Sequence, residues 1–297
     1  MNTFIKHLLL VTLMASPYAQ ATNTTTEKGK NLMTQEQSIK SNAAVKALEK
    51  EKKALLETVN QGVLDGYNKV VHATQLLAEQ GKEKEAIKAL QAATGKFDVA
   101  LAANPKLKLV PIDGDVSISA LITTPHLIKM ETKLVIDLLK EHKVQAARSL
   151  LAPMKDEMVI SRAYLPMGTY PDAIKLATKY LINGKKDNAL TTLATTLSTI
   201  VVETEVVPLA LVRTESLLKT AAELDKTKQK EQARELLNAA QEQLEVATLL
   251  GYAEKDSKAY DSLKADIKAL KKEIDGKNAV EKIYAKVKAS VKRLIGR

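Results

Sequence analysis

The sequence contains no cysteine and no tryptophan, and its two phenylalanines stand at positions 4 and 97. Without cysteine the chain can form neither disulfides nor thiolate metal sites, so its stability must come from buried surface. The scarcity of aromatic rings argues against the stacking platforms with which proteins bind single-stranded nucleic acid. The core must therefore be built from Ala, Leu, Ile and Val, whose compact side chains suit close helix packing.

Common catalytic signatures are also missing. The sequence has no G-x-S-x-G elbow, no phosphate-binding Gly-rich loop followed by Lys, and no G-x-G-x-x-G pattern. A metal site needs three or four convergent ligands. No potential ligand stands at metal-ligand spacing from any of the three histidines His72, His126 and His142. We therefore expect a protein that is not an enzyme, with no catalytic residue, no metal, no cofactor and no nucleic-acid partner.

The first 21 residues have the order of a secretory signal peptide. Lys6 and His7 precede an apolar run over residues 8–15, and Ala19-Gln20-Ala21 supplies the small residues that a signal peptidase reads. The apolar run is too short to be a membrane anchor, which needs about 20 residues. We expect cleavage near Thr22 and a soluble product exported to the periplasm.

The basic residues are concentrated at the C-terminus. The formal net charge is +10, and residues 277–297 contain seven Lys and Arg but one Glu. The apolar residues of this tail share one face of a helix, which could dock on the rest of the protein or lie on an anionic membrane surface. We favour docking. In the alternative, the membrane contacts would be made by Lys282, Lys286, Lys288, Lys292 and Arg293.

One phrase occurs four times along the chain. It reads "QGKEKEAIKAL" at 80–90, "EHKVQAARSLL" at 141–151, "NGKKDNALTTL" at 183–193 and "TKQKEQARELL" at 227–237. Each copy has polar residues, then an Ala, then a Leu four positions later, on the same helix face. The small Ala allows a neighbouring helix to approach, so each phrase predicts the corner of an αα-hairpin. The unequal intervals favour stacked hairpins over a regular superhelix.

The segment before the first corner predicts one long helix over residues 35–79, or two helices broken near Gly62 and Gly66. Its charged face indicates exposure to solvent. With the tail, this gives four predicted regions: a signal peptide (1–21), a charged N-terminal helix (22–59), a helical domain (60–252) and a basic C-terminal extension (253–297).

Two segments interrupt the helical pattern. Residues 106–122 alternate apolar and polar side chains around Asp113-Gly114, so they form either a hairpin of two short strands or an irregular loop. Residues 161–173 contain two prolines and a glycine, and we interpret them as a hinge between two halves of the chain.

A third segment carries the candidate acid-responsive groups. Glu203 and Glu205 interrupt a long apolar run just before Pro208. Read as a helix, this run would direct the two side chains to different faces, so one could point into the interior. A carboxylate held away from water there would take up a proton in mild acid. The competing interpretation, which we favour, is one exposed Glu and one paired with a base such as Arg213.

The order of several phrases resembles the bacterial YfdX-like family. The phrases are "LLAEQGKEKEAIKAL", "LVPIDGDVSIS", "MVISRAYLP", "LINGKKDNALTTL", "VVETEVVPL" and "KEQARELL", and together they span roughly residues 60–252. The resemblance implies a periplasmic, mainly α-helical protein of a stress-associated group linked with acid and drug-resistance regulons in enteric bacteria. It implies no assigned enzymatic activity and supplies no catalytic residues. The charged N-terminal helix and the region after Gly251 depart from the family pattern.

The sequence therefore predicts a mainly α fold, a bundle of stacked antiparallel αα-hairpins with at most one short β-hairpin near 106–122. We expect a homo-oligomer that acts as a non-enzymatic stress-response protein and binds or protects other envelope molecules, either periplasmic proteins or small molecules, with acid as one trigger. The alternative is a peripheral membrane or cell-wall tether that uses the basic C-terminal helix.

Overall fold

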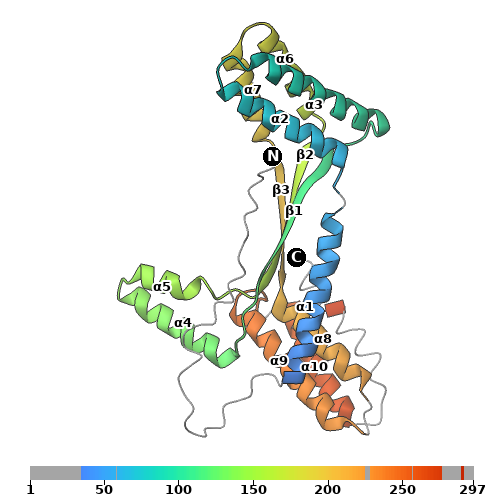
Figure 1. The fold of residues 1–297 in the computed structure, drawn as a ribbon. Coiled ribbons are helices and arrows are strands. Elements are labelled where there is room, and N and C mark those ends of the chain that lie inside the picture. The colour runs from blue at the N-terminus through green and yellow to red at the C-terminus, as the bar shows by residue number, and fades with distance from the viewer. Residues whose placement is uncertain (1–34, 58, 225–227, 256, 276–288, 291–297) are drawn as a thin grey trace. The chain divides into compact units, whose positions relative to one another are not determined.

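The computed structural model describes residues 35–57, 59–224, 228–255, 257–275 and 289–290. Within these ranges the fold is mainly α, as predicted, and none of the helices is long and apolar enough to span a membrane. The elements, shown in Figure 1, are α1 (Gln35–Leu56), α2 (Gln61–Ala78), α3 (Glu83–Ala103), β1 (Leu109–Ser119), α4 (Pro125–Lys140), α5 (Val144–Leu151), β2 (Glu157–Pro166), α6 (Tyr170–Ile182), α7 (Lys186–Leu197), β3 (Val201–Pro208), α8 (Leu209–Glu223), α9 (Lys230–Leu249) and α10 (Lys258–Asp275).

Helical hairpins and strands alternate along the chain. The hairpin α2–α3 precedes β1, α4–α5 precedes β2, α6–α7 precedes β3, and α8–α9 follows β3. Each corner coincides with one of the four repeated phrases. The Ala of every phrase is buried, with exposed fractions of 0% or 1% for Ala86, Ala147, Ala189 and Ala233. The prediction of four αα corners is confirmed.

Three corners turn through a residue in the left-handed region. Gly81 and Gly184 have φ of 76° and 70°, and His142 takes the same position between α4 and α5 with φ of 58°. A residue in this conformation ends a helix and redirects the chain, and glycine adopts it without a steric penalty. The α4–α5 corner therefore uses the same turn with a less suited residue.

The strands form one antiparallel sheet in the order β1-β2-β3. Residues 106–122 hold one long strand, and neither the hairpin nor the loop considered for them is present: β1 pairs with β2 from Leu109 to Ser119, with an irregularity between Pro111 and Asp113. The Asp-Gly turn signal lies inside the strand, because pairing with the distant β2 outweighs a local preference. The predicted hinge at 161–173 contains the second half of β2 and the start of α6.

Two large apolar clusters and one small one stabilise the fold. Helices α2, α3, α6 and α7 share a cluster with Val110, Ile112 and Leu165 of the sheet. A second cluster joins α8, α9 and α10 and includes Ile128 of α4. The small cluster packs α1 on the sheet through residues such as Val45 and Ile160. As expected from the composition, almost all of these side chains are aliphatic.

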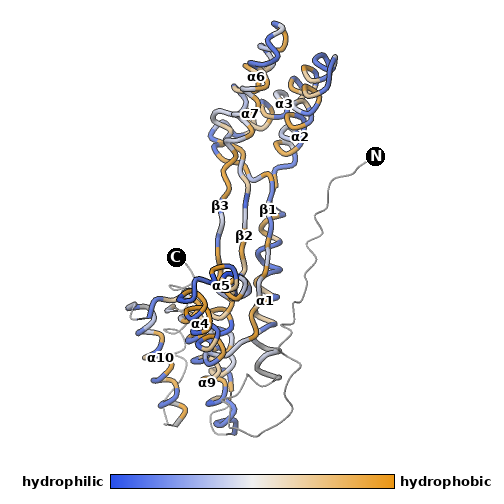
Figure 2. The backbone as a smooth tube through the Cα atoms, turned by 90° about the vertical axis from the view of Figure 1, so that its left-hand side faces the viewer, coloured by the Kyte–Doolittle hydropathy of each residue, from blue (hydrophilic) through white to orange (hydrophobic). Residues whose placement is uncertain are grey.

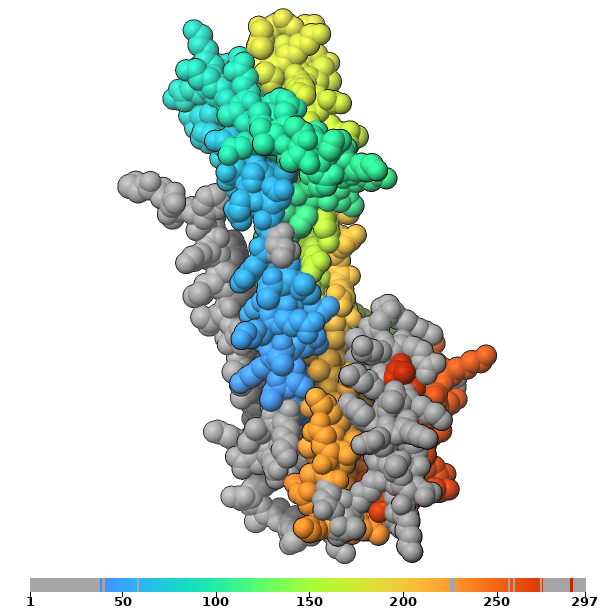
Figure 3. Space-filling model, turned by 90° about the vertical axis from the view of Figure 1, so that its right-hand side faces the viewer, coloured from blue at the N-terminus to red at the C-terminus, as the bar shows by residue number. Residues whose placement is uncertain are grey.

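The segment 35–79 forms two helices, and the break precedes the predicted glycines. The Asn60 side chain accepts a hydrogen bond from the Val63 N–H at 3.1 Å and so begins α2, while Gly62 and Gly66 lie within that helix. Helix α1 packs against α8, and Figure 3 shows the two side by side in blue and orange. The charged N-terminal helix therefore has an apolar side that is buried.

Candidate functional site

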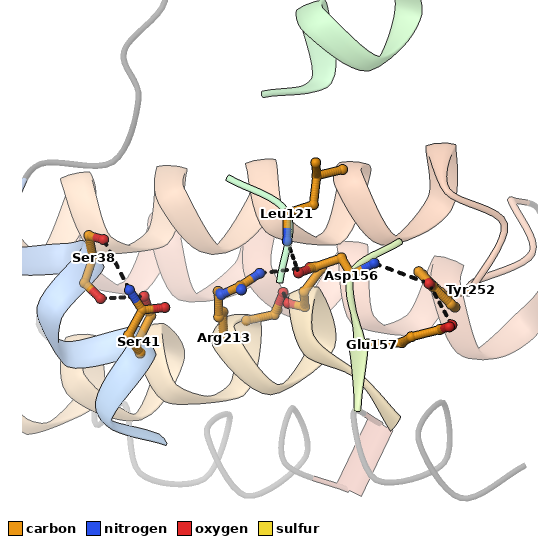
Figure 4. Close-up of polar contacts among 10 residues, drawn as sticks. Ser38, Ser41, Leu121, Asp156, Glu157, Arg213 and Tyr252 are labelled. Carbon is orange, nitrogen blue, oxygen red and sulfur yellow. Dashed lines mark hydrogen bonds and ion pairs between the residues drawn. The ribbon is translucent and has the colours of Figure 1, made fainter. Parts of the chain in front are cut away.

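A buried ion pair is the most unusual polar feature of the described residues. The Asp156 side chain is fully buried and accepts a hydrogen bond from Nη1 of Arg213 at 2.7 Å, and the Arg213 side chain is 6% exposed. Burying two charges costs more than their attraction returns unless further hydrogen bonds satisfy them. Figure 4 shows that Asp156 has such additional partners.

Asp156 binds two other segments of the chain through its oxygens. The Leu121 N–H, in the link between β1 and α4, donates to Oδ1 at 3.1 Å. The Leu209 N–H donates to the Asp156 carbonyl at 2.8 Å, and the Ala210 N–H also hydrogen-bonds the carboxylate. These two N–H groups belong to the first turn of α8, which has no side-chain cap of its own. Asp156 therefore caps α8 from a distant part of the sequence and complements its dipole.

Tyr252, which follows α9, extends the network. Its hydroxyl oxygen accepts from the Asp156 N–H at 3.2 Å, and the same hydroxyl donates to the Glu157 carboxylate at 2.8 Å. Burial, and then the hydrogen bond to Glu157, raise the pKa of Tyr252 to about 12. The hydroxyl thus remains protonated and available as a donor.

The network lies at the base of the α4–α5 hairpin. The chain enters the hairpin just after Leu121 and leaves it just before Asp156, so one carboxylate holds both ends of the hairpin and ties them to Arg213 of α8. Burial raises the pKa of the Asp156 carboxyl, although the charge and hydrogen bond of Arg213 oppose this effect. The chemistry available here is the uptake of a proton at the base of the hairpin.

The hairpin above this base carries an exposed apolar surface. Of 16 exposed large apolar side chains among the described residues, eight lie between positions 122 and 151. We call this set the apolar face of α4–α5, and Figure 2 shows the hydrophobic character of α4. Its members are Ile122, Leu127, Met130, Leu134, Ile136, Leu139, Val144 and Leu151.

The apolar residues of α4 cover more of the helix than one neighbour can bury. Ile128 and Val135, seven residues apart, are buried. Leu127, Met130 and Leu134 form an adjacent stripe by their spacing, and they are 44%, 55% and 50% exposed. A helix that is apolar over most of its circumference normally has partners on more than one side. Helix α4 therefore lacks a partner along this stripe within the described chain.

A solvent-open groove lies between α3 and α6. It has a volume of about 300 Å³ and is lined by Gln91, Thr94, Lys175, Thr178, Lys179 and Ile182. Several of its polar groups are already engaged: Lys175 pairs with Asp98 at 2.9 Å, and both threonine hydroxyls donate to backbone carbonyls of their own helices. The groove offers little polar chemistry for recognition.

The segment that carries Glu203 and Glu205 is the strand β3, and the helix assumed in the sequence argument was wrong. Both residues are exposed, and their spacing of two places them on the same face of the sheet. Glu205 pairs with Lys52 of α1 at 2.9 Å, and Glu203 lies opposite Arg162 of β2. Arg213 pairs with Asp156 instead. The β-branched residues around the two carboxylates favour a strand, and this indication in the sequence was missed.

The acid-responsive role of Glu203 and Glu205 stays a prediction. In this geometry protonation would remove the ion pair between β3 and α1, and an exposed pair contributes less than about 1 kcal/mol. We expect Glu203→Gln with Glu205→Gln to lower the free energy of unfolding by no more than that. Oligomeric state followed against pH tests the role itself: an acid transition lost in the double variant supports it, and an unchanged profile rejects it.

The other predicted site residues lie outside the described residues. These are the signal peptide and Lys282, Lys286, Lys288, Lys292 and Arg293 of the tail. Within the described ranges no group of His, Asp and Glu side chains is arranged to hold a metal ion. The Asp156 network was missed in the sequence because its members are 57 and 96 positions apart and no local pattern links them.

Comparison with known proteins identifies a family. The YfdX protein family model matches residues 67–206. A solved structure of Salmonella Typhi YfdX is similar at 12% sequence identity and a TM-score of 0.36, covering 51% of this chain and 93% of that chain. No curated protein matches the sequence. The family model spans the chain from α2 to β3, and over these residues the chain is similar to the YfdX family.

Proposed function

We propose that this is an exported, non-enzymatic stress-response protein that binds or protects other envelope molecules through the apolar face of α4–α5. The observation that carries the proposal is the concentration of eight exposed large apolar side chains on one hairpin and the link that leads into it. Apolar patches of this kind mark surfaces that bind other macromolecules. Unfolding proteins are suitable clients, because they expose apolar segments of many sequences.

Acid is the trigger that the geometry supports best. Proton uptake by Asp156 would remove its charge, and because burial raises the pKa of this carboxyl, the closed base holds the proton more tightly than an opened one, so acid favours the closed base. The other titratable groups of the network are Tyr252 and Glu157, which are joined to each other. A base held closed in acid would keep the apolar face of α4–α5 in place for clients. In this proposal the acid response acts at the base of the binding surface, in addition to the candidate carboxylates of β3.

The proposal predicts protection of an aggregating client. We expect the protein to suppress light scattering from a model enzyme that is warmed until it aggregates, with more suppression in mild acid. Met130→Lys with Leu134→Lys should abolish most of this effect, because two charges would then have to be desolvated against an apolar client. Both side chains are at least half exposed, so the double variant should fold normally.

A control variant carries the same charges on other helices. Val99 of α3 and Ile182 of α6 are 70% and 61% exposed, so Val99→Lys with Ile182→Lys should retain full protection. Full protection by the Met130 and Leu134 variant would exclude the apolar face as the binding surface. Equal loss in both variants would mean that net charge, and not this face, determines protection.

A further inference from the structure

The four hairpins of the chain are alike in sequence but not in burial. Leu90, Leu193 and Leu237, the leucines that follow the Ala in three of the corners, are each 0% exposed. Leu151 occupies the same position in the α4–α5 corner and is 47% exposed. The Ala beside it, Ala147, is buried in the hairpin at 1%. The α4–α5 hairpin is therefore folded within itself but, among the residues that the structure describes, lacks the outer neighbour that the other three have.

The other hairpins show what such a neighbour looks like. Hairpins α2–α3 and α6–α7 pack on one another, with α3 against α6 and α2 against α7. Their corner leucines and Phe97 belong to one shared cluster. Hairpin α8–α9 is covered by α1 and α10. Hairpin α4–α5 touches the rest of the described chain mainly at α9, through Ile128 and the ion pair of Lys129 with Glu245.

The observed hairpin pairing has a symmetry that two identical hairpins can satisfy. The second helix of one hairpin packs on the first helix of the other, and the first packs on the second. Two copies of α4–α5 related by a two-fold axis would make the same pair of contacts, α5 on α4 and α4 on α5. Such an isologous arrangement is the commonest form of homodimer.

On this basis, and resting on the proposed binding surface, we infer that the apolar face of α4–α5 is covered by the α4–α5 hairpin of a second copy of the chain. The four helices form a bundle in which each α4 packs on the other copy's α5. In the absence of a client, another copy of the chain thus covers the apolar face of α4–α5, and a client displaces that copy.

The charges of the hairpin are compatible with this partner. Lys140 and Lys143 form ion pairs with Asp137 and Glu141 at 3.6 Å and 2.8 Å, and Lys129 pairs with Glu245. The lysines at 129, 133 and 140 lie together on one side of α4, about a third of a turn around the helix from the Leu127 stripe. Two such hairpins could meet through their apolar sides while their lysine side chains remain in water. An anionic membrane would compete with these existing ion pairs.

The size of the face also suits a second copy. At a rise of 1.5 Å per residue α4 is about 24 Å long, and two adjacent helices are about 20 Å wide. Each copy would contribute roughly 500 Å², or roughly 1,000 Å² in total, which is the lower limit for a specific interface. We therefore expect a dimer that dissociates readily, as a surface shared with clients requires.

Sedimentation of the full chain tests self-association. The parent should sediment as a concentration-dependent dimer, or as a larger even-numbered assembly. Leu151→Lys should weaken self-association at least tenfold, because a charge would be buried against the other copy's α4. Val99→Lys, an equal change on exposed α3, should leave it unaltered. A parent that is monomeric, or a Leu151→Lys variant that associates as tightly as the parent, would overturn the inference.

The absence of cysteine allows the contact itself to be mapped. A chain with Leu151→Cys is mixed with a chain carrying Leu127→Cys, Met130→Cys or Leu134→Cys, and a short bismaleimide is added. At least one mixture should give a cross-linked pair, whereas Leu151→Cys with Val99→Cys should give none. Cross-linking in none of the three mixtures contradicts the inference. Client protection by a monomeric parent would retain the proposed function while removing this dimer.

Discussion

Arg213→Met should lower the free energy of unfolding by about 3 to 5 kcal/mol, since removal of one partner leaves a buried charge without compensation. Asp156 would keep its hydrogen bonds from Leu121 and the α8 backbone but lose its only ion pair within the described chain. Methionine fills a similar volume, so the effect reports the charge and not a cavity. Urea-induced unfolding followed by circular dichroism measures it.

The loss of unfolding free energy caused by Arg213→Met should depend on pH in a defined direction. Burial raises the pKa of Asp156 above its unfolded value, so the folded state holds the proton more tightly and this group's contribution to stability falls as pH rises through that window. Without Arg213 the pKa rises further. The difference between parent and variant should therefore be largest at neutral pH and shrink on acidification. A difference that grows in acid would contradict the assignment.

A double variant separates the pair from its surroundings. Asp156→Asn alone leaves Arg213 buried without a counter-charge and should also destabilise the protein. Asp156→Asn with Arg213→Met removes both charges and should be more stable than the Arg213→Met variant, because no isolated buried charge remains. If the double variant is as unstable as the sum of the two single ones, the two residues are not coupled.

The helical hairpins could be predicted from the sequence because their signals are local. Ala86 and Leu90 are four residues apart, and the same spacing recurs at Ala147, Ala189 and Ala233. Helix packing preserves such a pattern in any tertiary context. The pattern could not show that Leu151 is left half exposed, because burial of that side chain depends on which hairpins meet in space.

The sheet could be predicted only in part. The alternation in 106–122 indicated β structure, but the partners of β1 lie about 50 residues away in β2 and no local feature specifies them. The apolar run at 198–212 has no period that separates a buried helix from a strand, so Glu203 and Glu205 were placed on the wrong element. Pairing with β2 determined the outcome. The Asp156 network could not be found for the same reason, since it forms only when β2, α8 and Tyr252 come together.

Phe97→Ala removes a ring from the apolar cluster shared by α2, α3, α6 and α7. It should lower the free energy of unfolding by about 3 to 5 kcal/mol, as much as Arg213→Met. Phe97 is fully buried, and its ring meets that of Tyr170 edge to face with centroids 5.7 Å apart. Val99→Ala on the same helix, at a site 70% exposed, should change stability by less than about 0.5 kcal/mol. A loss below about 1 kcal/mol for Phe97→Ala would mean that the cluster collapses around the gap.

Gly66 determines how closely α2 approaches this ring, and it allows a second measurement on the same contact. A Cβ at position 66 would lie 2.6 Å from Cε1 of Phe97, so Gly66→Ala should destabilise the parent by about 1 to 3 kcal/mol through overpacking. In the Phe97→Ala background the ring is gone, and the same change should stabilise the protein by about 0.5 to 1 kcal/mol because Ala favours a helix over Gly. This reversal of sign distinguishes a glycine selected for close packing from one that breaks a helix. If Gly66→Ala destabilises both backgrounds equally, Phe97 is not the residue that requires glycine at this position.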